Sequence, residues 1–250
     1  MNQSRQPVFN VPSSVTAIVA VLGLIHAVRK LVLTPEQDLH FLLLSAFIPA
    51  RYDTSVLPGG SFPGGWGADI WTFVSYALIH ADLPHLGFNV VWLLPFGSAL
   101  ARRVGAARFF AFFAMTAAAG AVAHLVTHSG ELAPMIGASA SISGMMAAAM
   151  RFAFQRGGPL AMGRGEESSH VPAASLGAAL RDPRVLAFLG IWFGLNVLFG
   201  LGSLSLFGGE ESLAWEAHIG GFLAGLLLFA AFDPHPTPGI ERGDGERIQH

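Results

Sequence analysis

The sequence contains no cysteine among its 250 residues, and only 12% of them are Asp, Glu, Lys or Arg. The missing thiols exclude disulfides, thiolate catalysis and cysteine-based zinc sites. The charged fraction is about half of the roughly 25% that is usual in soluble domains, whereas 52% of the residues are hydrophobic. This balance indicates a protein with lipid as its solvent. The formal net charge of −2 provides no basic surface for phosphates, so we predict no nucleic-acid partner, and we predict no cofactor.

Six apolar stretches are interpreted as membrane-spanning helices, so we predict an all-α membrane protein with six transmembrane helices. The long first loop, residues 34–70, is rich in Gly and Pro but also holds short apolar runs and Trp66. We expect this loop to lie in the membrane interface, where aromatic side chains are favoured. The predicted spans are residues 15–28, 83–101, 109–126, 139–154, 185–199 and 213–232.

The distribution of Lys and Arg predicts the orientation in the membrane. With six spans, one side receives all of the 14 basic residues except Arg29, Lys30 and Arg51. The basic side is expected to be cytoplasmic and to contain both termini, although the Arg29-Lys30 pair argues against this. The predicted regions are a cytoplasmic tail (1–12), a six-helix core (13–233) with an insertion (155–184), and a disordered cytoplasmic tail (234–250).

Polar residues inside spans are costly and usually functional. Asn89 lies one turn after His85 in the second span, Ser139 opens the fourth span, and His218 lies in the sixth. Asn89, Ser139 and His218 are each about 12 to 15 residues from the charge that marks the cytoplasmic end of their span, or roughly 18–22 Å along a helix. We therefore expect them at one depth, about 10 Å below the outer surface of a ~30 Å hydrocarbon core.

This arrangement predicts serine-based hydrolysis. Neutral His218 would accept the proton of Ser139 as its hydroxyl attacks a peptide carbonyl. No carboxylate lies at the right depth to orient His218, so we predict a dyad without the third member of a triad. His85, Asn89 and the backbone N–H of Ser139 are the candidate oxyanion-hole donors.

Small residues favour close contact between the fourth and sixth spans. Gly221 and Gly225 follow His218 in a Gly-x-x-x-Gly pattern, and the fourth span begins with a run of Ala, Ser and Gly. On its own, the serine-rich start of the fourth span is explained better by packing than by catalysis. Its alignment in depth with His218 is what favours catalysis.

At these residues the sequence resembles the rhomboid family of intramembrane serine proteases, over about residues 70–232. The family's Gly-x-Ser-Gly motif matches Gly137-Ala138-Ser139-Ala140, and its His-x-x-x-Asn motif matches His85 to Asn89. Its Ala-His-x-x-Gly-x-x-x-Gly motif matches residues 217–225. The resemblance implies a rhomboid-type endopeptidase that cleaves transmembrane segments of single-span proteins. It also implies a bacterial inner-membrane protein whose active site opens to the outer face; the oligomeric state stays unknown.

Two departures from the family pattern leave alternatives open. Ala140 replaces the glycine after the nucleophile, and its methyl group could crowd the oxyanion region. The frame around Ser143 restores a Ser-Gly pair one turn deeper, but it lacks the preceding glycine turn, so Ser139 is preferred. Thr72 follows Trp71 where the family has arginine. The alternative function is a catalytically inactive rhomboid-like protein that binds transmembrane clients, although such members usually lack the serine or the histidine.

Three further polar features receive structural interpretations. His124 and His128 are one turn apart, as in some metal sites, but near a helix end they are interpreted as interfacial, and no metal site is predicted. Asn196 in the fifth span is interpreted as an interhelical hydrogen bond rather than a catalytic group. His80 is expected to bond a loop carbonyl.

The fifth span and the loop after it are the predicted substrate gate, because no residue there is expected to tie that span to the dyad. Trp192 and Phe199 share one helix face with Phe193 beside them, and we expect them to pack loosely on the second span near Phe88. In the following glycine-rich loop, Phe207 is expected to cover the site.

Overall fold

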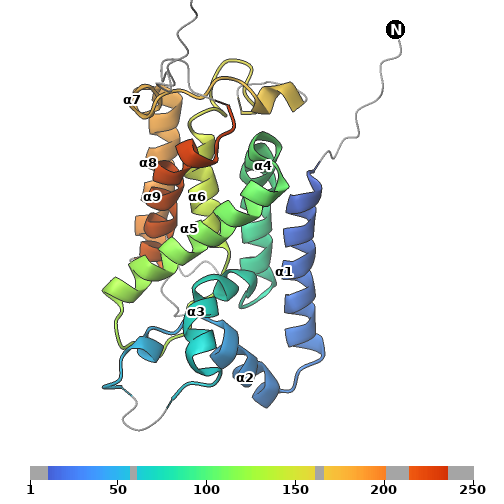
Figure 1. The fold of residues 1–250 in the computed structure, drawn as a ribbon, viewed down its shortest axis with the longest axis vertical. Helices are drawn as coiled ribbons and strands as arrows, with labels where there is room; N and C mark the ends of the chain where they lie inside the picture. The colour runs from blue at the N-terminus through green and yellow to red at the C-terminus, as the bar shows by residue number, and fades with distance from the viewer. Residues whose placement is uncertain (1–10, 57–60, 161–165, 201–213, 236–250) are drawn as a thin grey trace, which may run out of the picture.

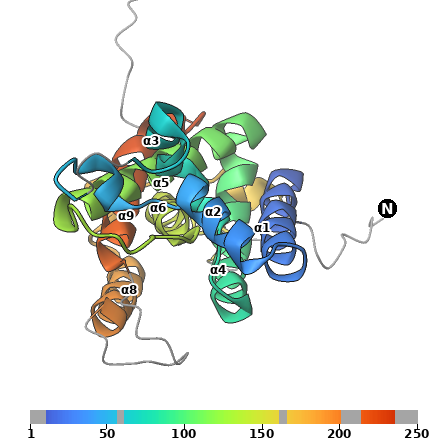
Figure 2. The same cartoon turned by 90° about the horizontal axis from the view of Figure 1, so that it is seen from below.

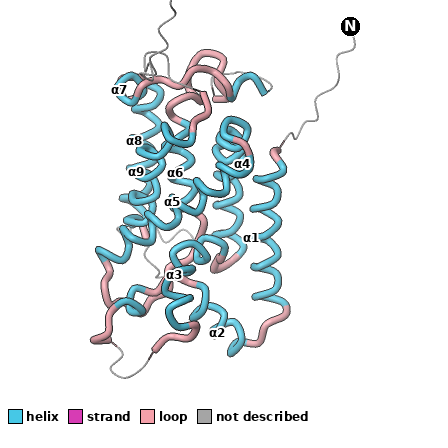
Figure 3. Tube along the Cα trace, in the orientation of Figure 1, coloured by secondary structure: helices cyan, strands magenta, loops and turns pink. Residues whose placement is uncertain are grey.

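Apolar helices dominate the computed structural model, which describes residues 11–56, 61–160, 166–200 and 214–235 (Figure 1). Helices and loops make up this part of the chain (Figure 3), and its sole β-type pairing is an isolated bridge between Phe47 and Met135. The predicted all-helical class is therefore confirmed for the described residues. The helices are α1 (Ser13–Leu31), α2 (Pro35–Ser45), η1 (Pro49–Tyr52), α3 (Gly65–Ser75), η2 (Tyr76–Leu78), α4 (Leu83–Val104), α5 (Ala106–Thr127), α6 (Ser139–Ala149), η3 (Glu166–Ser169), α7 (Leu176–Ala179), α8 (Pro183–Gly200) and α9 (Trp215–Phe232).

Within the described residues, 4 helices are long and apolar enough to cross a membrane, namely α1, α4, α5 and α9. The apolar part of α8 is shorter, from Pro183 to Leu198. Helix α6 has 11 residues, about 16 Å of helix, and so covers about half of a ~30 Å hydrocarbon core. Helix α6 alone therefore does not span the core, and loops extend the chain beyond its ends.

Two helix boundaries differ from those predicted. Helix α6 ends at Ala149 rather than near residue 154, because the chain tightens there into i→i−3 hydrogen bonds, from Arg151 N to Ala148 O (3.2 Å) and from Phe152 N to Ala149 O (3.0 Å). The arginine-rich loop predicted between the second and third spans shrinks to Gly105, whose φ of +79° lets α4 turn directly into α5.

The predicted interfacial loop contains two short helices, α2 and α3, and a buried arginine joins its parts. Arg51 donates to the carbonyls of Leu43 and Pro63, and it forms an ion pair with Asp69 (3.4 Å). Thr72, which stands where the family has arginine, is fully buried and lies 2.9 Å from the hydroxyl of Tyr52. The arginine that links the segments of this loop therefore comes from η1 rather than from α3.

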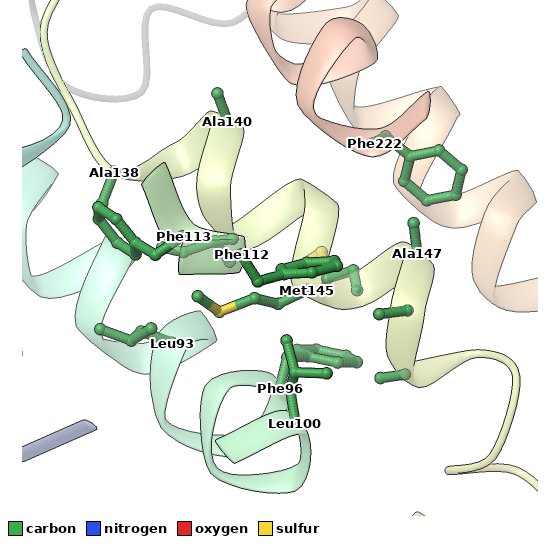
Figure 4. Packing of buried hydrophobic residues seen from close by; sticks show 14 of the residues in the cluster. Leu93, Phe96, Leu100, Phe112, Phe113, Ala138, Ala140, Met145, Ala147 and Phe222 are labelled. Carbon is green, nitrogen blue, oxygen red and sulfur yellow. The ribbon is translucent and has the colours of Figure 1, made fainter. Parts of the chain in front are cut away.

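Helix α6 lies at the centre of the bundle, with α4, α5 and α9 around it (Figure 2). Leu93 and Phe96 of α4, together with Phe112 of α5, pack around Met145 and Ala147 of α6 (Figure 4). All five side chains are buried. Ser139 thus opens a helix that the other helices hold on several sides.

The outer surfaces of the long helices carry large apolar side chains that the protein itself does not cover. Five of them, one on each of five helices, expose 64% to 77% of the residue's full accessible area, which in water would leave extensive apolar patches. A lipid environment accounts for them. They include Leu24 of α1, Val91 of α4, Val126 of α5, Ile191 of α8 and Leu227 of α9.

Arg103 ties together the ends of α4 and α9 that lie opposite the first loop. It forms an ion pair with Asp233 (2.8 Å) and donates to the carbonyls of Ser169 and Val171 (2.8 Å each). The described part of the 155–184 insertion is therefore anchored to the helical core. Most of the two predicted tails lies outside the described residues.

Candidate active site

Ser139 and His218 meet at the centre of the bundle although 79 residues separate them in the sequence. Their Oγ and Nε2 atoms lie 2.8 Å apart, which is hydrogen-bond distance. Ser139 is the first residue of α6 and His218 lies in the first turn of α9. Our expectation that these two side chains share one depth agrees with this geometry.

A glycine turn places Ser139 at the start of its helix. Gly137 has a φ of +121° and donates its N–H to the carbonyl of Tyr76 (3.0 Å). A Cβ at Gly137 would lie 2.8 Å from His85 Nε2 and 3.8 Å from Ser139 Oγ. The turn therefore needs glycine for its backbone conformation and also to leave space for the His85 ring beside Ser139.

The backbones of α6 and α9 touch directly below the dyad. A Cβ at Gly221 would overlap the backbone of Ala140, and one at Gly225 would overlap the backbone of Gly144. This contact needs the bare backbone of the Gly-x-x-x-Gly pattern. It brings the first turn of α9 close enough for His218 to reach Ser139.

Asn196 of α8 completes the set of polar groups around His218. Its Oδ1 lies 2.6 Å from His218 Nδ1, and its Nδ2 donates to the carbonyl of Trp192 (2.8 Å). Because the Trp192 carbonyl can only accept, the amide oxygen must face the histidine, and Nδ1 must carry the proton. The neutral ring then offers the lone pair of Nε2 to the hydroxyl of Ser139.

The sequence interpretation of Asn196 recognised the interhelical hydrogen bond but not its partner. It also held that nothing ties α8 to the dyad, and the bond to His218 shows that this was wrong. The depth argument would have found the residue, because Asn196 lies about 12 residues, or roughly 18 Å, from Arg184 near the start of α8. That height matches the one derived for Ser139.

His85 and Asn89 share one face at the start of α4. Asp82 caps this helix by accepting the N–H of His85 (2.7 Å), which fixes the first turn. Asn89 is buried and its Nδ2 donates to the carbonyl of His85 (2.9 Å), so one of its two amide protons is left for another acceptor. The ring of His80 packs edge-on against that of His85 with centroids 5.0 Å apart. The nitrogens of the buried His80 ring have no hydrogen-bond partner among the described residues, so the carbonyl bond expected for this ring is not formed there.

The geometry bears on the two questions that Ala140 raised, namely crowding of the oxyanion region and the choice between Ser139 and Ser143. The methyl group of Ala140 points at Gly120 of α5, where a Cβ would come 2.5 Å from it, so Gly120 and not the active site accommodates it. Ser143 lies one turn further along α6, and His218 directs its Nε2 at Ser139. Ser141 is fully buried and donates to the carbonyl of Phe113 (2.9 Å), a packing role.

The candidate gate residues pack against other partners than those predicted. We predicted that Trp192 would pack on α4 near Phe88, whereas its ring stacks on Phe222 of α9 with centroids 4.5 Å apart. The ring of Phe193 meets both Trp192 and Phe222 and is 41% exposed. Phe88, 48% exposed, packs on its own helix neighbour Trp92. The side chain of Phe199 and the whole of Phe207 lie outside the described residues.

Helix α8 contacts α4 in its N-terminal half, away from Asn196. The ring of Phe188 lies 5.6 Å from that of Phe96 and 5.7 Å from that of Phe154. The half of α8 that carries Asn196 is instead connected to α9, through Trp192 and His218.

The family model described as Rhomboid domain matches residues 67–233, more than half of the chain. The matched segment runs from α3 to the end of α9 and contains every residue of the Ser139 site. No curated protein matches this chain.

Proposed function

Because the chain belongs to the rhomboid family, we propose that it is an intramembrane serine endopeptidase that cleaves transmembrane segments of single-span membrane proteins. The observation that carries this proposal is the 2.8 Å hydrogen bond between Ser139 Oγ and His218 Nε2. A nucleophile, a base and a group that orients the base are the parts that acyl transfer by serine requires. Here Asn196 is the orienting group.

In the proposed reaction, Ser139 Oγ attacks the carbonyl carbon of the scissile peptide bond while His218 Nε2 takes the hydroxyl proton. The imidazolium that results keeps its Nδ1–H on Asn196 Oδ1, where the charge strengthens the hydrogen bond. His218 then gives its Nε2 proton to the departing amine, which leaves an acyl-enzyme on Ser139. Water, deprotonated by the same nitrogen, hydrolyses this ester and restores the serine.

The oxyanion formed in this reaction would lie at the start of α6. The first N–H groups of a helix have no intrahelical partner, and the helix dipole adds positive potential there. At the start of α6 the first helical hydrogen bond runs from Ile142 N to Ala138 O (3.0 Å), and the N–H of Ser139 makes no backbone hydrogen bond among the described residues, so it is proposed as a donor to the oxyanion. His85 and the second amide proton of Asn89 are the proposed side-chain donors.

We propose six spans, with α6 and α8 added to the four long helices, and with both termini in the cytoplasm. The Arg29-Lys30 pair argued against this orientation, but Arg29 is buried in an ion pair with Asp38 (2.6 Å) and donates to the carbonyl of His80 (2.9 Å). Its position is therefore explained by the packing of α1 on the first loop. In this orientation the active site opens to the outer face, at the end of the bundle that holds α2 and α3.

Substrate is proposed to reach Ser139 between α4 and α8. Phe88 and Phe193 are half-exposed aromatic rings on these two helices, at the level of the site, where a transmembrane segment could displace lipid. Of the two helices, α8 is proposed to be the one that moves. Few side chains attach the half of α8 that carries Asn196 to α9, whereas α4 packs on α6.

Covalent labelling with a fluorophosphonate probe in detergent tests the proposal. We expect the wild type to be labelled, and both Ser139→Ala and His218→Ala to lose labelling, because the two residues act as a unit. Ser143→Ala is the matched control and should be labelled like the wild type. A folded wild-type protein that takes up no probe would favour the catalytically inactive client-binding alternative, and labelling that depends on Ser143 would show that the nucleophile is misassigned.

A further inference from the structure

A second cluster of chemically reactive side chains lies where the end of α5 meets the start of α9 (Figure 1). His124 lies in the last turn of α5 and His128 directly follows the helix. Their rings are stacked, with centroids 4.3 Å apart and planes 20° from parallel. Glu216 lies in the first turn of α9, and its Oε1 is 4.0 Å from His128 Nε2. One donor atom from each of the three residues falls within a group no more than 4.8 Å across.

Two tightly packed helices hold this cluster in place. A Cβ at Gly220 would clash with Ala123 Cβ and the carbonyl of Ala119, and a Cβ at Gly120 would lie 2.9 Å from the carbonyl of Ala217. Helices α5 and α9 therefore approach to backbone contact beside the cluster. The geometry that brings Glu216 to the two histidines is set by rigid elements and not by a loop.

The hydrogen bonds of Thr127 determine which nitrogen of His128 is available. Thr127 Oγ1 lies 3.1 Å from the carbonyls of both Ala123 and His124, which can only accept, so its single proton is directed to them. Oγ1 also lies 2.8 Å from His128 Nδ1, which must then be the donor. In the neutral ring, Nε2 is left with a lone pair that faces the carboxylate of Glu216.

Two acceptors that face each other at 4.0 Å are stabilised when a proton or a metal ion lies between them. His124 adds a further unsatisfied group, because its buried Nδ1 has no hydrogen-bond partner among the described residues. One possible ligand atom from each of the three residues lies within 4.8 Å of the others, and no Lys or Arg among the described residues forms an ion pair with Glu216. This is the arrangement of a cation site.

We propose that His124, His128 and Glu216 bind a divalent transition-metal ion of the Zn²⁺ class. Two imidazoles and one carboxylate are a donor set that Zn²⁺ accepts, with a fourth position for water. Imidazole ligands favour Zn²⁺, Ni²⁺ or Cu²⁺ over the oxygen-preferring Mg²⁺ and Ca²⁺. The hydrogen bond from His128 Nδ1 to Thr127 is the outer-shell contact that usually orients a metal-binding histidine.

The bound ion would fasten the end of α5 to the first turn of α9, two residues before His218. It would therefore stabilise the helix that carries the base without touching the reacting atoms. The proposal stands on the geometry of the three residues and is independent of the proteolytic function, so metal binding is measured directly.

The test uses the full-length protein in detergent, purified without a polyhistidine tag and stripped with a chelator. Zn²⁺ is titrated in competition with a chromophoric chelator, and metal content is measured by mass spectrometry. We expect one saturable site per chain and a higher thermal midpoint with Zn²⁺. Glu216→Gln and Thr127→Val, which preserve size, should each weaken binding by at least about 10-fold, the lower end of what loss of an outer-shell partner causes.

His170→Ala is the matched control, because His170 Nδ1 and His235 Nε2 form a second histidine pair 2.8 Å apart at the other end of the bundle. We expect this variant to bind Zn²⁺ at the proposed site with unchanged affinity. Loss of the saturable site in His170→Ala together with its retention in Glu216→Gln would overturn the proposal. A wild type with no saturable Zn²⁺ site would overturn it as well and would leave Glu216 and a protonated His128 as an ion pair.

Discussion

Replacing Asn196 with alanine should slow proteolysis without weakening substrate binding. Asn196 Oδ1 accepts the Nδ1–H of His218 at 2.6 Å, and it acts on the reaction only through that ring. In the ground state it holds a neutral imidazole. In the transition state the same bond is made to an imidazolium, so its contribution grows as the reaction proceeds.

The expected magnitude follows from this difference. A hydrogen bond to a charged group contributes about 1.5–3 kcal/mol and one between neutral groups about 0.5–1.5 kcal/mol, so the difference is about 1–1.5 kcal/mol. Each 1.36 kcal/mol changes a rate about tenfold, so Asn196→Ala should lower kcat by about 5- to 13-fold and leave KM nearly unchanged. Asn196→Asp restores an acceptor for Nδ1–H while losing the donor to the Trp192 carbonyl, so its kcat should fall between those of Asn196→Ala and the wild type.

The assay is cleavage of a purified transmembrane reporter in proteoliposomes, with kcat and KM measured separately. Val197→Ala is the control, because Val197 is the next residue of α8 and is 51% exposed, so its truncation tests for a general disturbance of the helix. A kcat of Asn196→Ala within twofold of the wild type would refute the orienting role. An equal loss in Val197→Ala, or a change confined to KM, would refute it too.

Three further outcomes are expected. Gly225→Ala places a methyl group into the backbone of Gly144 and should lower the unfolding free energy by about 1–3 kcal/mol, measured as a lower thermal midpoint. The control Gly190→Ala, whose methyl group meets nothing within 4 Å, should not lower the midpoint. Trp192→Ala removes the ring that stacks on α9 and should raise the cleavage rate of a transmembrane substrate while lowering thermal stability; an unchanged rate would place the gate elsewhere. In this cysteine-free chain, Leu132→Cys should react with an impermeant thiol reagent in intact cells and Ala106→Cys should not, and the reverse pattern would invert the proposed topology.

The sequence was sufficient to predict the helical class and to pair Ser139 with His218. Depth along a span is a one-dimensional quantity that follows from helix rise and terminal charges, so the two residues could be placed at one level without knowing how the helices pack. The Gly-x-x-x-Gly pattern after His218 then indicated which helix would touch α6. Both inferences depend on distances along single helices, which sequence determines well.

The contacts missed from the sequence depend on how helices are rotated against each other. Asn196 was assigned to an interhelical bond, but its partner becomes known only when α8 is docked on α9. Glu216 lies two residues before His218 and so points to a different side of α9. That other direction leads to His124 and His128, and the contact is created by the backbone approach of α5 and α9 at Gly220.

Helix α8 is both the proposed substrate gate and the helix that orients His218, and these two roles constrain each other. Its Phe188 is held between Phe96 and Phe154, while Asn196, eight residues further on, holds His218. A tilt of α8 about Phe188 moves Asn196 with a lever of about 12 Å, so about 10° displaces it by about 2 Å. That displacement exceeds the reach of a hydrogen bond. If substrate enters by tilting α8, the base loses its orienting partner while the gate is open and regains it when α8 closes on the substrate. The gate and the orientation of His218 are then one conformational variable. A variant locked open should bind substrate more readily but turn it over with a poorly oriented base, whereas Trp192→Ala only loosens α8, leaves it free to close, and is therefore expected to cleave faster.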